Sequence, residues 1–197
     1  MAAKIRFWLA YYIVRVLLRR VKIEVHGLEN LPENQGFVIA SSHKHDWDPV
    51  LIMLGLKRHI HFLSIDSNFT KDFFSGLTIR FMQQMPVSRK NKIMNKNAIL
   101  RAASYIKSGE IVGIFPEGDL EQKKKKIFPG IAIIAQKSNS KIVPIFIKVD
   151  APRSYGINTN FSHVKIIIGK PIKFRKSVGY TKNLAMKKIY GLKRDRL

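Results

Sequence analysis

Short apolar runs, each followed directly by a polar cluster, are the feature of this sequence that most constrains its fold. Residues 37–40 form one such run and residues 111–114 form another. An apolar run of this length is typical of a buried strand. Residues 43–48 follow the first run and residues 115–118 follow the second, and both segments carry polar side chains. Because sites in open α/β sheets form beyond the carboxyl ends of strands, we expect the two clusters to share one site.

The rest of the chain alternates between strand-like and helix-like segments. Further strands are expected at residues 21–25, 61–65, 142–149 and 164–168, and helices at residues 49–56, 70–82, 91–107, 129–137 and 181–190. In the helix at residues 91–107, the side chains expected on or near one face are Ile93, Ile99, Leu100, Ala103 and Ile106. This alternation predicts an α/β fold: a single domain with a mixed β-sheet flanked by helices.

Composition limits the class of protein. The chain has 197 residues and is 46% hydrophobic, which suits one folded domain with a core. It contains no cysteine, which excludes disulfides and thiolate metal sites and fits a cytosolic compartment. The 36 Lys and Arg residues against 13 Asp and Glu residues give a net charge of +23. Such an excess predicts an anionic partner, either nucleic acid or an anionic membrane surface.

The first 20 residues are predicted to form an amphipathic helix. No Gly or Pro interrupts residues 4–20, and the cationic side chains of Lys4, Arg15 and Arg19 share one side of a helix. The apolar stretch between the flanking arginines is too short to cross a bilayer, which takes about 20 residues. A helix with Trp and Tyr among its apolar residues is suited to the membrane interface. The alternative is that it packs on the protein's own core.

His43 and Asp48 are the candidate catalytic residues. A neutral histidine can accept a proton from an alcohol, and a carboxylate bonded to the other ring nitrogen fixes the tautomer and stabilises the imidazolium. The two side chains can meet if the turn between them folds back. The substrate's own hydroxyl would then be the nucleophile. Arg89 lies in a basic segment and is a candidate for binding a phosphate, because the guanidinium matches phosphate geometry.

Four sequence blocks together resemble the motifs of the glycerolipid acyltransferase family, which includes the 1-acylglycerol-3-phosphate acyltransferases. Residues 42–48 are similar to its Asn-His-x4-Asp motif, and residues 83–89 to its Gly-x5-Arg segment. Residues 115–120 resemble its Phe-Pro-Glu-Gly-Thr-Arg motif, and residues 143–145 match its Val-Pro-Ile strand. Residues 130–135 resemble the helix that family members place between these last two. The order and spacing match from about residue 21 to residue 170.

The resemblance implies a membrane-associated enzyme whose residues 21–197 form the acyltransferase domain. It would transfer a fatty acyl group from a thioester to a lysophospholipid hydroxyl, converting 1-acylglycerol-3-phosphate to phosphatidic acid. His43 would be the general base and Asp48 its partner. The residues expected to shape the acceptor-phosphate site are Arg89, Phe115, Pro116, Glu117 and Gly118. No metal or cofactor is expected; acyl-CoA or acyl carrier protein would be the co-substrate.

The expected partners and location follow from the same resemblance and from the charge. The partners are anionic membrane lipids, the lysophospholipid acceptor and the acyl donor, and no nucleic acid is expected. The enzyme would lie on the cytoplasmic face of the cell membrane as a peripheral or monotopic protein.

The sequence departs from the family pattern at several positions. Ser42 stands in place of Asn, and Gln83 in place of Gly. In the third motif Asp119 and Leu120 replace Thr and Arg. Losing an arginine and gaining a carboxylate should weaken phosphate binding there, and the lysines at 123–126 are a poor substitute for a fixed guanidinium. The acyl-transfer chemistry is therefore better supported than the identity of the acceptor.

The sequence is also compatible with three alternative functions. One is an acyltransferase acting on another lysolipid or polar acceptor. A second is a basic nucleic-acid-binding module, suggested by the net charge of +23. The third is a zinc metallohydrolase, because residues 43–48 read His-x-His-Asp-x-Asp. The nucleic-acid-binding alternative explains neither the His43–Asp48 pair nor residues 115–118, and the zinc alternative needs further ligands from distant segments.

Overall fold

The computed structural model describes residues 2–66, 84–88, 90–118, 127–150 and 161–193. Within them a sheet of seven strands runs in the order β1-β7-β6-β2-β5-β3-β4. Its strands are β1 (Lys22–His26), β2 (Phe37–Ser41), β3 (Ile60–Ile65), β4 (Met85–Val87), β5 (Ile111–Ile114), β6 (Ile142–Val149) and β7 (His163–Ile168). Neighbouring strands are parallel except β6 and β7, which are antiparallel. The expectation of a mixed sheet in an α/β domain is confirmed.

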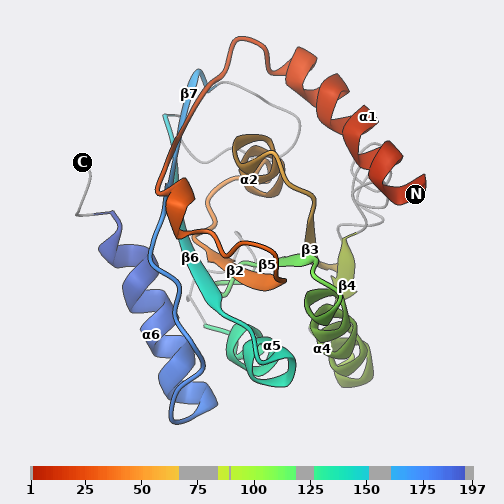
Figure 1. Cartoon of the computed structure of the whole chain (residues 1–197), viewed down its shortest axis with the longest axis vertical. Coiled ribbons are helices and arrows are strands. Elements are labelled where there is room, and N and C mark those ends of the chain that lie inside the picture. Colours follow the sequence, from red (N-terminus) through yellow and green to blue (C-terminus); the bar gives the residue numbers. More distant parts are fainter. Residues whose placement is uncertain (1, 67–83, 89, 119–126, 151–160, 194–197) are drawn as a thin grey trace.

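Helices cover both faces of this sheet (Figure 1). The helices are α1 (Ala2–Leu17), α2 (Asp48–Leu56), α4 (Lys92–Lys107), α5 (Gly130–Ser138) and α6 (Val178–Gly191). Helices α1 and α2 pack with one core cluster, whereas α4, α5 and α6 pack with a second. In β2 successive side chains alternate between the two clusters, so Phe37 and Ile39 enter the first and Val38 and Ala40 the second. A fully apolar strand is required at this position because both of its faces are buried.

Helix α1 has one buried face and one exposed face. Phe7 is 4% exposed and joins the first core cluster, and Tyr11 and Val14 pack against that cluster. Large apolar side chains nevertheless remain exposed on the same helix: Trp8, Leu9, Tyr12, Ile13, Val16 and Leu17. The alternative of packing on the protein's own core therefore holds for one face only. Among the described residues, no helix is long and apolar enough to cross a membrane.

Helix α4 differs from its expected apolar face. Ala103 and Ile106 are buried in the second core cluster, but Ile93 is 73% exposed and Leu100 is 46% exposed. The prediction of a shared face is therefore wrong for these two side chains. Small residues at Ala98 and Ala102 form the rest of the buried surface instead, because they let the helix approach the sheet closely.

The predicted strand and helix segments otherwise match the structure to within a few residues at their ends. The exceptions are β4, a three-residue strand that was not expected, and the helix expected at residues 70–82, which falls outside the described residues. Helix α4 ends at Lys107, and Gly109 just beyond it adopts a left-handed backbone with φ 87°, a conformation common where helices end.

Candidate active site

His43 and Asp48 lie beyond the carboxyl end of β2, and their side chains meet. The Nδ1 atom of His43 is 2.9 Å from Oδ2 of Asp48. Asp48 is the first residue of α2, so a short turn brings its carboxylate back toward the histidine. The expected folding-back of this segment is therefore found. An ionised carboxylate can only accept a hydrogen bond, so Nδ1 carries the proton and donates a hydrogen bond to Oδ2. Nε2 is then the unprotonated, basic nitrogen.

The turn is held by the same carboxylate oxygen. Besides the histidine, Oδ2 of Asp48 accepts the backbone N–H of Lys44 at 2.6 Å and that of His45 at 2.9 Å. Asp48 is fully buried, and its Oδ1 has no hydrogen-bond partner among the described residues. One buried oxygen therefore fixes both the backbone of the turn and the orientation of the imidazole, so the histidine is preorganised rather than mobile.

An aromatic stack joins the first polar cluster to the second. The His43 ring lies against Phe115 with ring centroids 4.0 Å apart and planes 19° apart, and Phe115 stacks in turn on Phe62 at 5.2 Å. Gly113 makes room for this stack, because a Cβ there would lie 2.3 Å from the Phe62 ring. The side chain of His43 is 14% exposed. The expectation that the clusters after β2 and β5 share one site therefore agrees with the geometry.

The segment from Phe115 to Gly118 forms a tight turn. The backbone N–H of Gly118 donates to the carbonyl of Phe115 at 3.0 Å, and Gly118 has φ 76°, a conformation that glycine adopts without strain. The carbonyl of Pro116 accepts the N–H of Phe128 at 2.8 Å. Glu117 is only 5% exposed, and its Oε1 accepts a hydrogen bond from the hydroxyl of Tyr190 in α6. The carboxylate is thus buried and oriented rather than free at the surface.

Ser42 has a structural role at the position where the family motif has Asn. Its hydroxyl accepts the backbone N–H of Ile147 at 3.1 Å, and its own N–H donates to the carbonyl of Ile145 at 3.2 Å. These bonds extend the pairing of β2 with β6 by one residue past the end of the strand. They fix the backbone directly before His43.

Arg89, the candidate phosphate ligand, lies outside the described residues, as do Gln83, Asp119, Leu120 and residues 123–126. Its neighbour Ser88 is held by Asn95 of α4 through a pair of bonds. The Ser88 N–H donates to Asn95 Oδ1 at 2.8 Å, and Asn95 Nδ2 donates to the Ser88 carbonyl at 2.6 Å. The chain beside Arg89 is therefore tied to the start of α4.

Several residues of this arrangement were not singled out in the sequence. Tyr190 lies 73 residues from Glu117, and only the fold places the two together. Phe62 and Gly113 form the base of the stack on which His43 rests. A glycine inside an apolar strand run is a signal for close approach of another group, so Gly113 was recognisable in principle.

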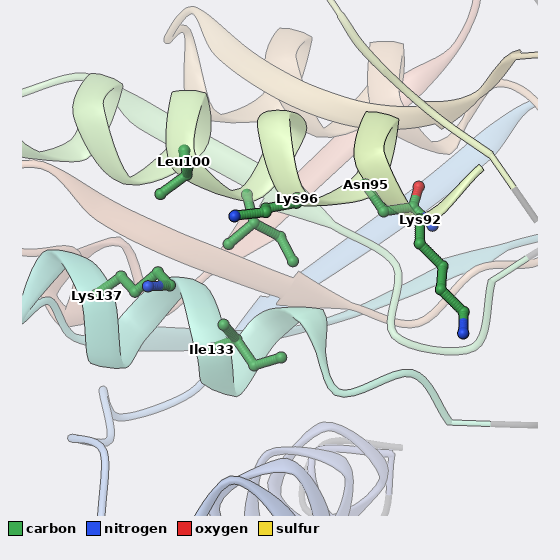
Figure 2. A pocket seen from close by; sticks show the side chains of 7 residues that line it. Lys92, Asn95, Lys96, Leu100, Ile133 and Lys137 are labelled. Carbon is green, nitrogen blue, oxygen red and sulfur yellow. The ribbon is translucent and has the colours of Figure 1, made fainter.

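A groove between α4 and α5 has a basic rim and an apolar floor (Figure 2). It is lined by Lys92, Asn95, Lys96, Ile99, Leu100, Ile133 and Lys137. Its lining includes no residue of the two motif turns. Leu100, which was expected on or near the apolar face of this helix, is one of the lining residues.

The zinc-hydrolase alternative is not supported by the arrangement of ligands. Asp48 is engaged by His43 and by two backbone N–H groups through one oxygen. Among the described residues, the His, Asp and Glu side chains that lie close enough together to hold one ion are His59, His61 and Glu110. They do not belong to the segment 43–48.

Comparison with known proteins decides the family. The model of the Acyltransferase family matches residues 22–148. This chain belongs to the acyltransferase family. The expectation of an O-acyltransferase is therefore confirmed. The nucleic-acid-binding alternative does not account for this match.

Named relatives and a solved structure agree with this family. The acyltransferase is 30% identical over 158 residues to a 1-acyl-sn-glycerol-3-phosphate acyltransferase from Bacillus subtilis, covering 80% of this chain and 77% of the relative. It is 27% identical over 157 residues to a chloroplastic 1-acyl-sn-glycerol-3-phosphate acyltransferase from Arabidopsis thaliana, covering 77% of this chain and 44% of that longer protein. Its fold matches the crystal structure of the 1-acyl-sn-glycerophosphate acyltransferase PlsC from Thermotoga maritima. The TM-score is 0.68 at 19% identity, over 100% of this chain and 84% of the other.

Proposed function

We propose that this acyltransferase moves a fatty acyl group from an acyl thioester to the free hydroxyl of a lysophospholipid. The proposed acceptor is 1-acylglycerol-3-phosphate, and the product is phosphatidic acid. The observation that carries the proposal is the His43–Asp48 pair, with Nδ1 and Oδ2 2.9 Å apart, stacked on Phe115 of the second motif. The acceptor is supported by the relatives from Bacillus subtilis and Arabidopsis thaliana, both of which are named 1-acyl-sn-glycerol-3-phosphate acyltransferases.

The proposed reaction begins with the acceptor hydroxyl near Nε2 of His43. Nε2 takes the hydroxyl proton as the oxygen attacks the thioester carbonyl, and Asp48 stabilises the imidazolium that results. A tetrahedral oxyanion forms and then collapses, the carbon–sulfur bond breaks, and the proton passes from His43 to the departing thiolate. The products are the ester and a free thiol, and no acyl group is attached to the protein at any step.

The acceptor phosphate is proposed to bind among Arg89, Glu117 and Gly118. Support comes from the compact turn that holds Glu117 and Gly118, and from the bonds that tie Ser88 to α4 beside Arg89. A buried carboxylate cannot itself bind a phosphate dianion favourably. Its proposed role is therefore to orient a cation or a hydroxyl of the glycerol backbone.

Membrane association is proposed to occur through α1. Its exposed apolar side chains recur at spacings of one, three and four residues: Trp8, Leu9, Tyr12, Ile13, Val16 and Leu17. On a helix this spacing forms one continuous stripe, which lies opposite the face that packs on the core. Exposing such a stripe to water is unfavourable, whereas the membrane interface would bury it. The net charge of +23 favours an anionic leaflet, and we propose its cytoplasmic side.

The acyl donor is proposed to be acyl-CoA or acyl carrier protein. Both are anionic, so the basic surface favours either one. No metal or other cofactor enters the proposed reaction.

The decisive experiment supplies the purified full-length chain with radiolabelled acyl-CoA, or acyl carrier protein, and a panel of acceptors. The panel contains 1-acylglycerol-3-phosphate, glycerol-3-phosphate, lysophosphatidylglycerol and lysophosphatidylcholine, in mixed vesicles. We expect labelled phosphatidic acid as the main product. Labelling of another acceptor at a higher kcat/KM would support the alternative, an acyltransferase for another lysolipid or polar acceptor.

A further inference from the structure

Two histidines and a glutamate lie together at the amino-terminal ends of β3 and β5, the opposite end of these strands from His43 and Asp48. His59 directly precedes β3, His61 is its second residue, and Glu110 directly precedes β5. The parallel pairing of Ile60 with Ile111 places the starts of both strands side by side. Because His43 follows the carboxyl end of the parallel strand β2, the cluster lies at the amino end of the same sheet, away from the catalytic pair.

The three side chains are close enough to share one ion. One ligand atom from each of the three residues lies within 4.8 Å of the other two, and Nε2 of His61 is 3.7 Å from Oε2 of Glu110. In a tetrahedral zinc site with bonds near 2.0–2.1 Å, neighbouring ligand atoms are about 3.3 Å apart. His61 is buried, whereas His59 and Glu110 are half-buried. Small side-chain rotations of His59 and Glu110 can therefore shorten the distances between ligand atoms to about 3.3 Å. Both residues are partly exposed, so solvent can reach the ion.

Surrounding groups fix the ligands in this position. The ring of Tyr105 stacks on His61 with centroids 4.1 Å apart and planes 1° apart. The hydroxyl of Tyr105 accepts two bonds from Arg101, at 3.1 and 2.8 Å, and its carbonyl accepts the N–H of Glu110 at 2.9 Å. Tyr105 therefore supports His61 through its ring and Glu110 through its backbone carbonyl. Such support is what a preorganised metal site needs.

We propose that His59, His61 and Glu110 bind one divalent transition-metal ion, with water completing the coordination. Two imidazoles and a carboxylate suit the borderline ions, Zn²⁺ above all, and do not suit Ca²⁺ or Mg²⁺, which take oxygen ligands. The ion has no part in acyl transfer, and the inference does not depend on the proposed acceptor.

The ion would link the two helical layers of the molecule. The ring of His59 also lies against Phe7 of α1, with centroids 4.8 Å apart, while His61 lies against Tyr105 of α4. Helix α1 packs on one core cluster, and Ala102 and Ile106 of α4 lie in the other. A metal bound by His59 and His61 would fix the surface on which Phe7 of α1 packs. Its role would therefore be structural.

A second group of similar composition provides the internal control. Glu24 lies 3.3 Å from His163 Nε2 and 3.9 Å from His26 Nε2, but Lys22 Nζ is nearer, at 2.7 Å. The hydrogen bond from Lys22 holds the pKa of Glu24 below its ordinary value. An ammonium beside the carboxylate competes with any metal, so we expect this group to bind none tightly.

The test is calorimetric titration of the untagged full-length chain with ZnCl₂ after dialysis against EDTA. We expect one ion per chain. We also expect at least about a tenfold weaker affinity in each of the variants His59→Gln and Glu110→Gln, because each loses one of three protein ligands. The double variant with His26→Gln and His163→Gln should bind zinc as the parent does. A thermal scan at a hundredfold excess of Zn²⁺ over its Kd should raise Tm by roughly 5–10 °C in the parent.

The outcomes separate the proposal from its rivals. The proposal is overturned if the parent binds no stoichiometric zinc, or if His59→Gln and Glu110→Gln bind it as tightly as the parent does. It is equally overturned if the His26→Gln and His163→Gln variant is the one that loses binding. His59 and Glu110 are half-buried, so we expect both single variants to fold. Circular dichroism before the titration checks this. Acyl transfer by the parent should persist after EDTA treatment, which keeps this test independent of the proposed reaction.

Discussion

The hydroxyl of Tyr190, near the end of α6, donates a hydrogen bond to Oε1 of Glu117 in the turn after β5. The bond connects the third motif to a segment that no motif includes. The bond ties α6 to the turn after β5. The helix packs on the second core cluster through Ala185, Met186 and Ile189, which sets the position of the hydroxyl.

Replacing Tyr190 by Phe should therefore weaken acyl transfer without disrupting the fold. The buried carboxylate loses one donor, which costs about 1 kcal/mol, or about a fivefold loss of kcat/KM if Glu117 positions the acceptor. The acceptor's KM, measured at saturating donor, should account for most of the change. Tyr180→Phe on the exposed side of the same helix is the matched control and should behave as the parent does. Equal kinetics for both variants would remove Glu117 from the acceptor site.

Replacing His43 by Ala should lower kcat at least about a hundredfold, because the general base is lost. The side chain is 14% exposed, and the two backbone N–H groups still hold Asp48 after its loss, so the protein should remain folded. His163→Ala, another histidine with a carboxylate neighbour, is the control and should retain full activity. Acyl transfer near the parental rate by the His43→Ala protein would refute the assignment of the base.

Asp48→Asn tests whether the carboxylate acts through the histidine. The amide can still accept the backbone N–H groups of Lys44 and His45, but it lacks the negative charge that stabilises the imidazolium. We expect a loss of roughly 10²-fold in kcat. The amide NH₂ would take the place of the buried Oδ1, and burying that donor without an acceptor would cost about 1–3 kcal/mol of folding stability.

The double variant gives the sharper result for this pair. Once His43 is Ala, the further change Asp48→Asn should have almost no additional effect on kcat, because its only route to the reaction has been removed. Fully additive losses would mean that Asp48 acts on the substrate directly.

The strands next to the site could be predicted from the sequence because they are buried on both faces. β2 and β5 are short apolar runs, and the rule that sites form at carboxyl strand ends brought residues 43–48 and 115–118 together. β4 could not be found this way, because three residues that include Pro86 give no periodicity. The partnership of Tyr190 with Glu117 depends on how α6 docks, which no local pattern encodes.

The two apolar faces of helices α1 and α4 show a second limit. On α4 five apolar residues were expected on or near one face, yet Ile93 and Leu100 are exposed, while Ala98 and Ala102 are buried. On α1 apolar side chains cover two faces, and only the packing of Phe7 distinguishes the core-facing side from the exposed one. Periodicity thus identifies an amphipathic helix but cannot say what its apolar face meets.

Gly113→Ala should destabilise the domain and impair the site together. The added Cβ would lie 2.3 Å from the Phe62 ring, in the middle of β5, so the ring and the stack above it must shift. Overpacking of this kind costs about 1–3 kcal/mol. We expect a lower urea midpoint and a reduced kcat, since His43 rests on the same stack. Gly179→Ala is the control, because its Cβ meets only Ser177 Oγ at 4.0 Å and a helix favours Ala by about 1 kcal/mol. A Gly113→Ala protein with parental stability and activity would show that the stack is not tightly packed.

The exposed stripe of α1 can be tested without removing the helix. Deleting residues 1–20 would also remove Phe7 and Leu18, both buried in the core, so loss of binding by that protein would not identify the cause. We therefore propose the triple change Leu9→Ser, Ile13→Ser and Val16→Ser, which leaves the core-facing side intact.

Sedimentation with anionic vesicles should show at least about a tenfold lower affinity for this variant, because three apolar side chains no longer enter the interface. The melting temperature in the absence of lipid should stay within a few degrees of the parent's. The matched control is the pair Ile93→Ser and Leu100→Ser on α4, which removes exposed apolar side chains of the same kind elsewhere on the surface. If the α4 pair weakens vesicle binding and the α1 triple does not, the membrane-facing surface is on α4 and the assignment to α1 is wrong.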